Sequence, residues 1–150
     1  MLKPGDKAPD FELHDENGEP RKLSTLLQDG PVVLFFYPAA MTAGCTAEAC
    51  HFRDLAGEFK EAGGQRIGIS PDSVEKQRQF TDQNGFDYPL LADVDGEVAR
   101  AFGVKRKIAI TPVKRATFVI GRDGKVVDVI ASELRMSVHA DKALEALARA

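Results

Sequence analysis

Six consecutive apolar or aromatic residues, 32–37, limit most strongly what this 150-residue chain can fold into. The run VVLFFY contains no charged side chain with which one face would meet water. β-Branched and aromatic residues favour strands, and a strand buried on both faces is typical of a sheet covered by helices on both sides. We therefore expect residues 32–37 to form a central strand of such a sheet.

Predicted strands and helices alternate along the rest of the sequence. The order is typical of an α/β domain. It predicts a thioredoxin-like fold with an N-terminal β-hairpin extension and a central mixed sheet flanked by helices. Outside 32–37, the predicted strands are 11–13, 21–23, 65–70, 88–92, 117–120 and 126–130, and the predicted helices are 24–30, 45–62, 73–85, 97–102 and 138–150. Ser24 and Ser73 are the expected caps of two of these helices, and Pro112 should break any regular element within 103–114.

Length and charge narrow the classes of function. The chain is long enough for one domain with a sizeable core, and we expect residues 1–150 to form that single domain. A net charge of −3 gives no reason to expect binding to nucleic acid or to an anionic membrane. No apolar stretch approaches the roughly 20 residues that span a bilayer, and the N-terminus has no signal-peptide core. We therefore expect a cytoplasmic protein, in which a permanent disulfide is disfavoured.

The only two cysteines, Cys45 and Cys50, lie at the start of the predicted helix 45–62. Free N–H groups and the helix dipole stabilise a thiolate there, and the thiolate is the reactive form of cysteine. In an intact helix, two residues five apart have Cα atoms about 8–9 Å from each other. A disulfide needs about 4.4–6.8 Å, so this pair can bond only if the first helical turns unwind.

Other residues near Cys45 in the sequence suit a nucleophile site. Thr42 offers a hydroxyl to the thiol or to a bound oxygen. Gly44 lets the backbone approach closely, and Pro38 stiffens the exit from the strand. A cation from a distant part of the chain would stabilise the thiolate further. Arg115, just before the predicted strand 117–120, is our candidate for that cation.

The pattern P-x-x-x-T-x-x-C of residues 38–45 resembles the active-site motif of peroxiredoxins. Its continuation, G-C-T-x-E-A-C at 44–50, is similar to the peroxiredoxin Q branch, also called bacterioferritin comigratory proteins. The resemblance extends over nearly the whole chain. One departure is Ala43, which stands where this branch usually has a proline, and another is Ala39-Ala40 in place of a charged pair. Ala43 should leave the loop less rigid without removing a reacting group.

The resemblance implies a role for each residue of the peroxide site. Cys45 would be the peroxidatic cysteine, which attacks the O–O bond of a hydroperoxide and becomes a sulfenic acid. Thr42 and Arg115 would orient the peroxide and stabilise the charge that develops on its oxygens. Pro38 would shield the pocket from water, and Gly44 would lie beside the bound substrate.

The resemblance also implies how the enzyme is restored. Cys50 would resolve the sulfenic acid of Cys45 as an intramolecular disulfide, and thioredoxin or a similar dithiol would reduce this disulfide by exchange. Hydrogen peroxide and organic hydroperoxides are the implied substrates of such an antioxidant enzyme. The chemistry needs no metal and no organic cofactor. We expect a monomer or a weak dimer, because an intramolecular disulfide removes one reason for a stable dimer.

Three alternatives stay open on the sequence. In the first, the chain is a one-cysteine peroxidase in which Cys50 is non-essential. A thiol–disulfide oxidoreductase of the same fold is a second alternative, although such enzymes generally use C-x-x-C and this chain has C-x₄-C. A non-catalytic thioredoxin-like binding module, the third, would need neither Thr42 nor Arg115.

The remaining polar residues of interest are one acid and three histidines. Glu48 suits hydrogen bonds to loop N–H groups or to Arg115, and equally suits a first-turn acid that favours the helix dipole. His51 follows Cys50, but the set does not match a usual zinc spacing. His14 and His139 are expected to be solvated.

Overall fold

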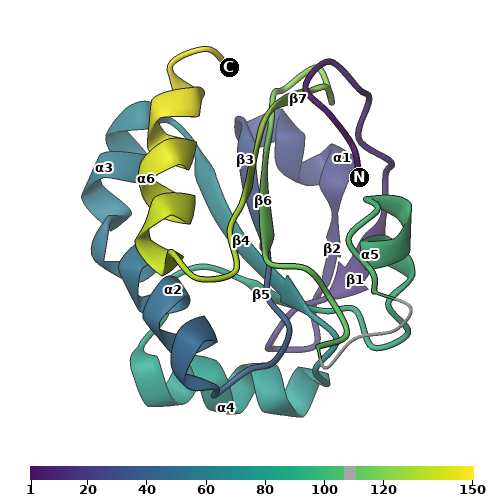
Figure 1. Cartoon of the computed structure of the whole chain (residues 1–150), viewed down its shortest axis with the longest axis vertical. Coiled ribbons are helices and arrows are strands. Elements are labelled where there is room, and N and C mark those ends of the chain that lie inside the picture. Colours follow the sequence, from purple (N-terminus) through teal and green to yellow (C-terminus); the bar gives the residue numbers. More distant parts are fainter. Residues whose placement is uncertain (107–110) are drawn as a thin grey trace.

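The computed structural model describes residues 1–106 and 111–150. Five strands form one mixed sheet in the order β5-β4-β3-β6-β7 (Figure 1). The strands are β3 (Val32–Phe36), β4 (Gln65–Ser70), β5 (Leu90–Ala92), β6 (Ala116–Ile120) and β7 (Val126–Ala131). β3 pairs in parallel with β4 and antiparallel with β6, so the predicted central strand is confirmed.

Helices cover both faces of this sheet, as the uninterrupted apolar run predicted. The helices are α1 (Leu23–Leu26), the 3-10 turn η1 (Leu27–Asp29), α2 (Ala43–Asp54), α3 (Ala56–Ala62), α4 (Val74–Asn84), α5 (Glu97–Ala101) and α6 (Met136–Leu147). Figure 1 shows α2, α3 and α6 on one side of the sheet and α1 and α5 on the other. Val33 and Phe35 of β3 pack into the core under α2, α3 and α6, whereas Leu34 and Phe36 pack into the core on the other face. Every residue of β3 is therefore buried.

The predicted N-terminal hairpin is confirmed as a separate two-stranded sheet. Strand β1 (Glu12–His14) pairs antiparallel with β2 (Pro20–Lys22). The buried carboxylate of Asp15 closes the turn, because it accepts hydrogen bonds from the backbone N–H groups of Asn17 and Glu19 and from Arg21 Nε. One charged side chain thus supplies the acceptors that this turn needs.

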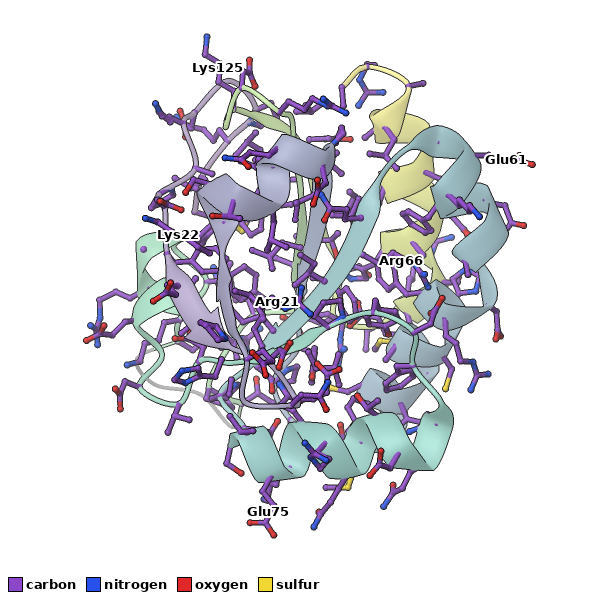
Figure 2. The ribbon with its side chains drawn as sticks, turned by 180° about the vertical axis from the view of Figure 1, so that it is seen from behind. Arg21, Lys22, Glu61, Arg66, Glu75 and Lys125 are labelled. Atoms are coloured by element: carbon purple, nitrogen blue, oxygen red, sulfur yellow. The ribbon has the colours of Figure 1, made fainter. Side chains whose placement is uncertain are left out.

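The predicted helix 45–62 is wrong in two respects. It starts earlier, at Ala43, and it is broken at Leu55 into α2 and α3. In a continuous helix the Phe52 carbonyl would accept from the N–H of residue 56. Here it accepts a hydrogen bond of 3.0 Å from Nη1 of Arg66, which Figure 2 shows on β4 beside these helices. A contact between distant parts of the chain therefore accompanies the break.

Other helix boundaries also differ from the predicted ones, among them the end of the last helix, at Leu147 rather than at residue 150. Ser24 is not a cap but the second residue of α1, and its N–H donates to the carboxylate of Asp10 instead. The last helix starts at Met136 rather than at residue 138. Ser73 does cap α4, as predicted. Of the segment predicted to lack regular structure, residues 107–110 lie outside the described residues. No helix in the described part of the chain is both long and apolar enough to cross a membrane.

Candidate active site

Cys45 lies in the first turn of α2, directly after the loop that leaves β3. Its side chain is buried, and it packs in the core cluster that contains Val33 and Phe35. Met41, in the same loop, has a φ of 66°, a left-handed conformation that is uncommon for a residue with a side chain. The chain thus leaves the fully buried strand β3 through a strained loop and places the thiol at a helix N-terminus, where a thiolate is favoured.

Arg115 contacts Cys45 although 70 positions separate them in the sequence. Its Nη2 lies 3.3 Å from Cys45 Sγ, and its Nη1 donates a hydrogen bond of 2.8 Å to Glu48 Oε1. The sheet explains this placement, because antiparallel pairing sets Ala116 opposite Phe36 and so brings residue 115 beside the loop that follows β3. A buried guanidinium, which stays charged, therefore faces the sulfur.

Gly44 and Pro38 border this arrangement. A Cβ atom on Gly44 would lie 3.4 Å from Arg115 Nη2 and 3.4 Å from Met136 Cε, so the missing side chain leaves space next to the guanidinium. Pro38 is buried where the chain leaves β3. Gly44 thus lies beside Arg115, and Pro38 lies in the loop between β3 and α2.

Thr42 and Ala43 form the start of α2. Thr42 is exposed and occupies the N-cap position, and its hydroxyl donates to the carbonyl of Ala39 at 2.8 Å. Its oxygen lone pairs are left to accept a further hydrogen bond. Ala43 is the first helical residue, the position at which a proline is best tolerated. The helix start therefore has room for the proline that the peroxiredoxin Q branch usually carries.

Cys50 is half-buried on the same helix, and both thiols are free. Its Sγ contacts Asn84 Oδ1 at 3.6 Å. Because α2 is continuous from Ala43 to Asp54, the Cα atoms of the two cysteines are held about 8–9 Å apart. The structure thus shows the dithiol form with an intact helix, in which the two sulfurs cannot bond.

Comparison with known proteins decides the family. Residues 4–129 match the AhpC/TSA family. The chain is 62% identical over 148 residues to a putative peroxiredoxin of Mycobacterium tuberculosis, a match that covers 97% of this chain and 96% of that protein. The chain is a peroxiredoxin of the AhpC/TSA family. As an enzyme of that family, it is a thiol peroxidase whose substrates are hydroperoxides.

Solved structures place this peroxiredoxin in the branch that the cysteine motif indicated. Peroxidoxin BcpB of Mycobacterium tuberculosis superimposes with a TM-score of 0.95 at 61% identity, covering 99% of this chain and 98% of that chain. The bacterioferritin comigratory protein of Xanthomonas campestris, whose alkyl peroxide reduction activity is described with its structure, gives a TM-score of 0.84 at 31% identity, covering 93% and 90%. The thioredoxin-like fold and the peroxiredoxin Q resemblance are confirmed.

Two hydrogen bonds connect the second half of α2 to residues outside the helix. The Tyr88 hydroxyl donates to the Ala49 carbonyl at 2.7 Å, and Arg53 Nη1 donates to the Asn84 carbonyl at 2.7 Å. The two residues of α2 that form these bonds, Ala49 and Arg53, flank Cys50 in the sequence. Sequence reasoning missed these partners, because neither Tyr88 nor Asn84 belongs to the motif around Cys45.

A buried polar group of this peroxiredoxin lies behind Arg115, away from the sulfur. His139 was expected to be solvated and is fully buried on α6, so that prediction was wrong. His139 lies on the buried side of α6 with Ala140 and Ala143, and its ring contacts the Thr117 hydroxyl of β6 and the Ser132 carbonyl. His14, by contrast, is exposed, as expected. Glu48 is also fully buried, and its contact with Arg115 selects one of the two roles that its position allowed.

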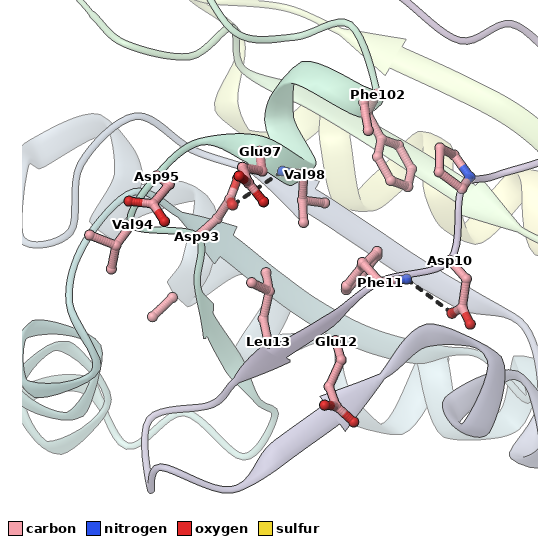
Figure 3. Close-up of a pocket in the computed structure, with 13 residues that line it drawn as sticks. Asp10, Phe11, Glu12, Leu13, Asp93, Val94, Asp95, Glu97, Val98 and Phe102 are labelled. Atoms are coloured by element: carbon pink, nitrogen blue, oxygen red, sulfur yellow. Dashed lines mark hydrogen bonds between the residues drawn. The ribbon is translucent and has the colours of Figure 1, made fainter.

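A pocket of about 420 Å³ opens elsewhere, between the N-terminal hairpin and α5 (Figure 3). Several acidic residues line it, and one of them, Asp93, already accepts hydrogen bonds from the backbone N–H groups of Val98 and Ala99. None of the predicted site residues lines it. Within residues 1–106 and 111–150, no group of three or more His, Cys, Asp or Glu side chains is arranged to hold a metal ion.

Proposed function

We propose that this peroxiredoxin reduces hydroperoxides through Cys45 and Cys50 in an intramolecular disulfide cycle. The observation that carries the proposal is the Arg115 guanidinium 3.3 Å from Cys45 Sγ, at the start of the helix that also bears Cys50. A buried cation and a helix N-terminus both favour the thiolate, which is the nucleophile in this reaction.

The first step forms a sulfur–oxygen bond. The Cys45 thiolate attacks the terminal oxygen of the hydroperoxide, the O–O bond breaks, and the leaving oxygen departs as an alcohol or water after taking up a proton. Arg115 would stabilise the negative charge on the two oxygens, and the free lone pairs of Thr42 would accept from the peroxide O–H. Gly44 leaves space for the substrate, and the buried Pro38 would keep water away.

The second step joins the two cysteines. The Cys50 thiolate attacks the sulfur of the Cys45 sulfenic acid, a disulfide forms, the S–O bond breaks, and the hydroxide that leaves takes up a proton to become water. The intact α2 forbids this bond, so we infer that the helix unwinds before it forms. Thioredoxin or a similar dithiol would then reduce the disulfide by exchange. Because the cycle needs such a reductant, we place the enzyme in the cytoplasm.

The substrate range and the assembly state follow from the same proposal. The alkyl peroxide activity described for the Xanthomonas campestris protein supports organic hydroperoxides as substrates beside hydrogen peroxide. A disulfide within one chain needs no second copy, so we propose that residues 1–150 act as one domain, in a monomer or a weak dimer.

Thiol counting after a single turnover tests the two-cysteine cycle. Reduced protein is mixed with one equivalent of hydrogen peroxide, quenched with an alkylating agent and weighed by mass spectrometry. Wild-type protein should lose both free thiols together. Cys50→Ser should instead accumulate a sulfenic acid at Cys45 that dimedone traps. A Cys50 thiol that remains free in oxidised wild type would show that the enzyme uses one cysteine only.

Tyr88→Phe should speed disulfide formation without changing the first step. The substitution removes the hydrogen bond to the Ala49 carbonyl and keeps the ring in place, so the folded helix loses about 1 kcal/mol relative to the unwound one. The rate of disulfide formation should then rise about fivefold. Stopped-flow fluorescence or rapid quench after peroxide addition measures this rate.

Tyr37→Phe is the matched control for that variant. The Tyr37 hydroxyl is equally buried, but it bonds to Gln77 of α4 and not to α2. If the two variants change the rate of disulfide formation equally, or if neither does, Tyr88 does not restrain α2 in the way that we describe.

A further inference from the structure

Three buried polar side chains meet behind Arg115, and the reaction described above uses none of them. Glu48 of α2, Thr117 of β6 and His139 of α6 are all fully buried. His139 Nδ1 lies 2.8 Å from Thr117 Oγ1 and 3.5 Å from Glu48 Oε2, and its Nε2 lies 2.9 Å from the carbonyl oxygen of Ser132. Glu48 Oε2 has no hydrogen-bond partner within normal distance. Buried polar atoms without partners are rare and costly.

The hydrogen-bond partners of His139 determine whether a proton must lie between His139 and Glu48. The Ser132 carbonyl can only accept, so His139 Nε2 carries a proton. In the neutral imidazole Nδ1 is then an acceptor with a single lone pair, which the Thr117 hydroxyl at 2.8 Å and a Glu48 O–H at 3.5 Å would share as two donors. A Glu48 carboxylate would face this nitrogen with a second acceptor and no hydrogen between them. The contact is favourable only if one proton is shared by Glu48 and His139.

The surroundings place this proton on Glu48. Burial raises the pKa of Glu48 to about 8, because desolvation outweighs the attraction of Arg115 and nearby Glu133 adds repulsion. Burial also lowers the pKa of His139, and the positive charge of Arg115 acts in the same direction. At neutral pH the pair therefore consists of a carboxylic acid and a neutral imidazole.

We propose that Glu48 works as a neutral carboxylic acid whose proton faces His139, and that this pair leaves the charge of Arg115 to the Cys45 thiolate. The proposal rests on the function proposed above, in which Cys45 is the nucleophile. Arg115 Nη1 can still donate to the carbonyl-type oxygen of the acid at 2.8 Å, so the guanidinium keeps its position. Glu48 and His139 are then positioning residues, since both act through Arg115.

Among the described residues, the ionisable groups that face this pair are Arg115, Cys45, Glu133 and Tyr88. Arg115 contacts Glu48 from the start of β6, and Cys45 lies one helical turn before Glu48 on α2. Glu133, in the loop before α6, accepts from the Arg115 backbone N–H and pairs with Arg106. The phenol of Tyr88 lies nearby and donates to a backbone carbonyl. Loss of the Glu48 proton would therefore add a second full carboxylate next to Arg115 and weaken its hold on the sulfur.

The pH dependence of Cys45 oxidation tests this proposal. The rate constant for the reaction of reduced enzyme with hydrogen peroxide is measured by stopped flow between pH 5 and pH 10. The wild-type rate should fall above pH 8 as Glu48 loses its proton, by roughly tenfold between pH 7 and pH 9 if only the acid form is active. In Glu48→Gln, a neutral side chain of the same shape, this alkaline fall should disappear.

His139→Gln should move the fall to lower pH, because an amide N–H directed at Glu48 stabilises the carboxylate. His51→Gln is the matched control: His51 also links α2 to α6, through Asp141 at 2.8 Å, but it does not contact Glu48 or Arg115. Its profile should coincide with that of the wild type. An infrared difference spectrum of wild type minus Glu48→Gln at pH 7 should also show the C=O band of a protonated carboxyl, a readout that does not depend on activity.

The results separate this proposal from the proposed function. If Cys45 is oxidised normally but the wild-type rate stays flat above pH 8, or if the infrared band is that of a carboxylate, Glu48 acts as an anion and the inference is wrong. If His139→Gln and His51→Gln shift the profile equally, His139 has no specific effect. If Cys45 is not the residue that is oxidised, the proposed function itself fails.

Discussion

Cys45→Ser should reduce the reaction of the enzyme with hydrogen peroxide to the rate of an ordinary solvent-exposed thiol. A serine hydroxyl stays protonated at neutral pH and does not attack an O–O bond, whereas the Cys45 thiolate is favoured by Arg115 at 3.3 Å and by the N-terminus of α2. Only Cys50 would then remain to react, and it is half-buried against Asn84. Peroxide consumption by reduced protein in stopped flow measures the loss.

The control for this variant is Cys50→Ser, which keeps the first step. One equivalent of peroxide should disappear as quickly with Cys50→Ser as with wild type, and mass spectrometry should locate the added oxygen on Cys45. Equal rates for Cys45→Ser and wild type would refute the assignment of Cys45 as the nucleophile.

Arg115→Gln should slow the oxidation of Cys45 by about 10²–10³-fold, the usual cost of removing one preorganised donor from an active site. The guanidinium contacts both Cys45 Sγ and Glu48 Oε1, and a glutamine reaches neither with a positive charge. The oxidation rate of Arg115→Lys should lie between those of wild type and Arg115→Gln, because a lysine keeps the positive charge but not the planar guanidinium. The second-order rate constant with hydrogen peroxide is the measurement.

Arg149→Gln is a suitable control for a general effect of charge. Arg149 pairs with Asp128 at 3.1 Å on the surface, and its replacement should leave the rate unchanged. Urea unfolding should show that Arg115→Gln is still folded under the assay conditions. A folded Arg115→Gln that reacts within a factor of three of wild type would mean that Arg115 does not stabilise the reacting oxygens.

The parts of the fold that follow from local sequence were predictable. The run 32–37 has no charged residue, and its first five residues form the fully buried β3. Ser73 and Gly85 carry their own capping signals, and α4 begins and ends at them. Arg115 could be named as a candidate because it stands just before a predicted strand, but the antiparallel pairing of that strand with β3, which brings Arg115 to the loop after β3, comes from the structure.

Features that depend on distant contacts were not predictable. No residue between 45 and 62 indicates that Arg66 will donate a hydrogen bond to the Phe52 carbonyl, so the helix was expected to be continuous. His139 was expected to be solvated because nothing near it in the sequence shows that Thr117 of β6 and the Ser132 carbonyl will supply its hydrogen-bond partners. For Glu48 the sequence allowed two roles equally, hydrogen bonding to loop N–H groups or to Arg115 and a first-turn acid that favours the helix dipole, and only the approach of β6 to α2 decides between them.

The break at Leu55 has a consequence for how the stability of the molecule is divided. α2 can open as a small cooperative unit of its own, while α3 remains packed against α6 and β4. In the proposed unwinding, α2 would give up its contacts with α6 and the stacking of Phe52 on Phe35, whereas the pairing of the five strands would be kept. Substitutions in residues 43–54 should therefore adjust how fast the enzyme recycles, and substitutions in the sheet should adjust how much heat it withstands, with little exchange between the two properties.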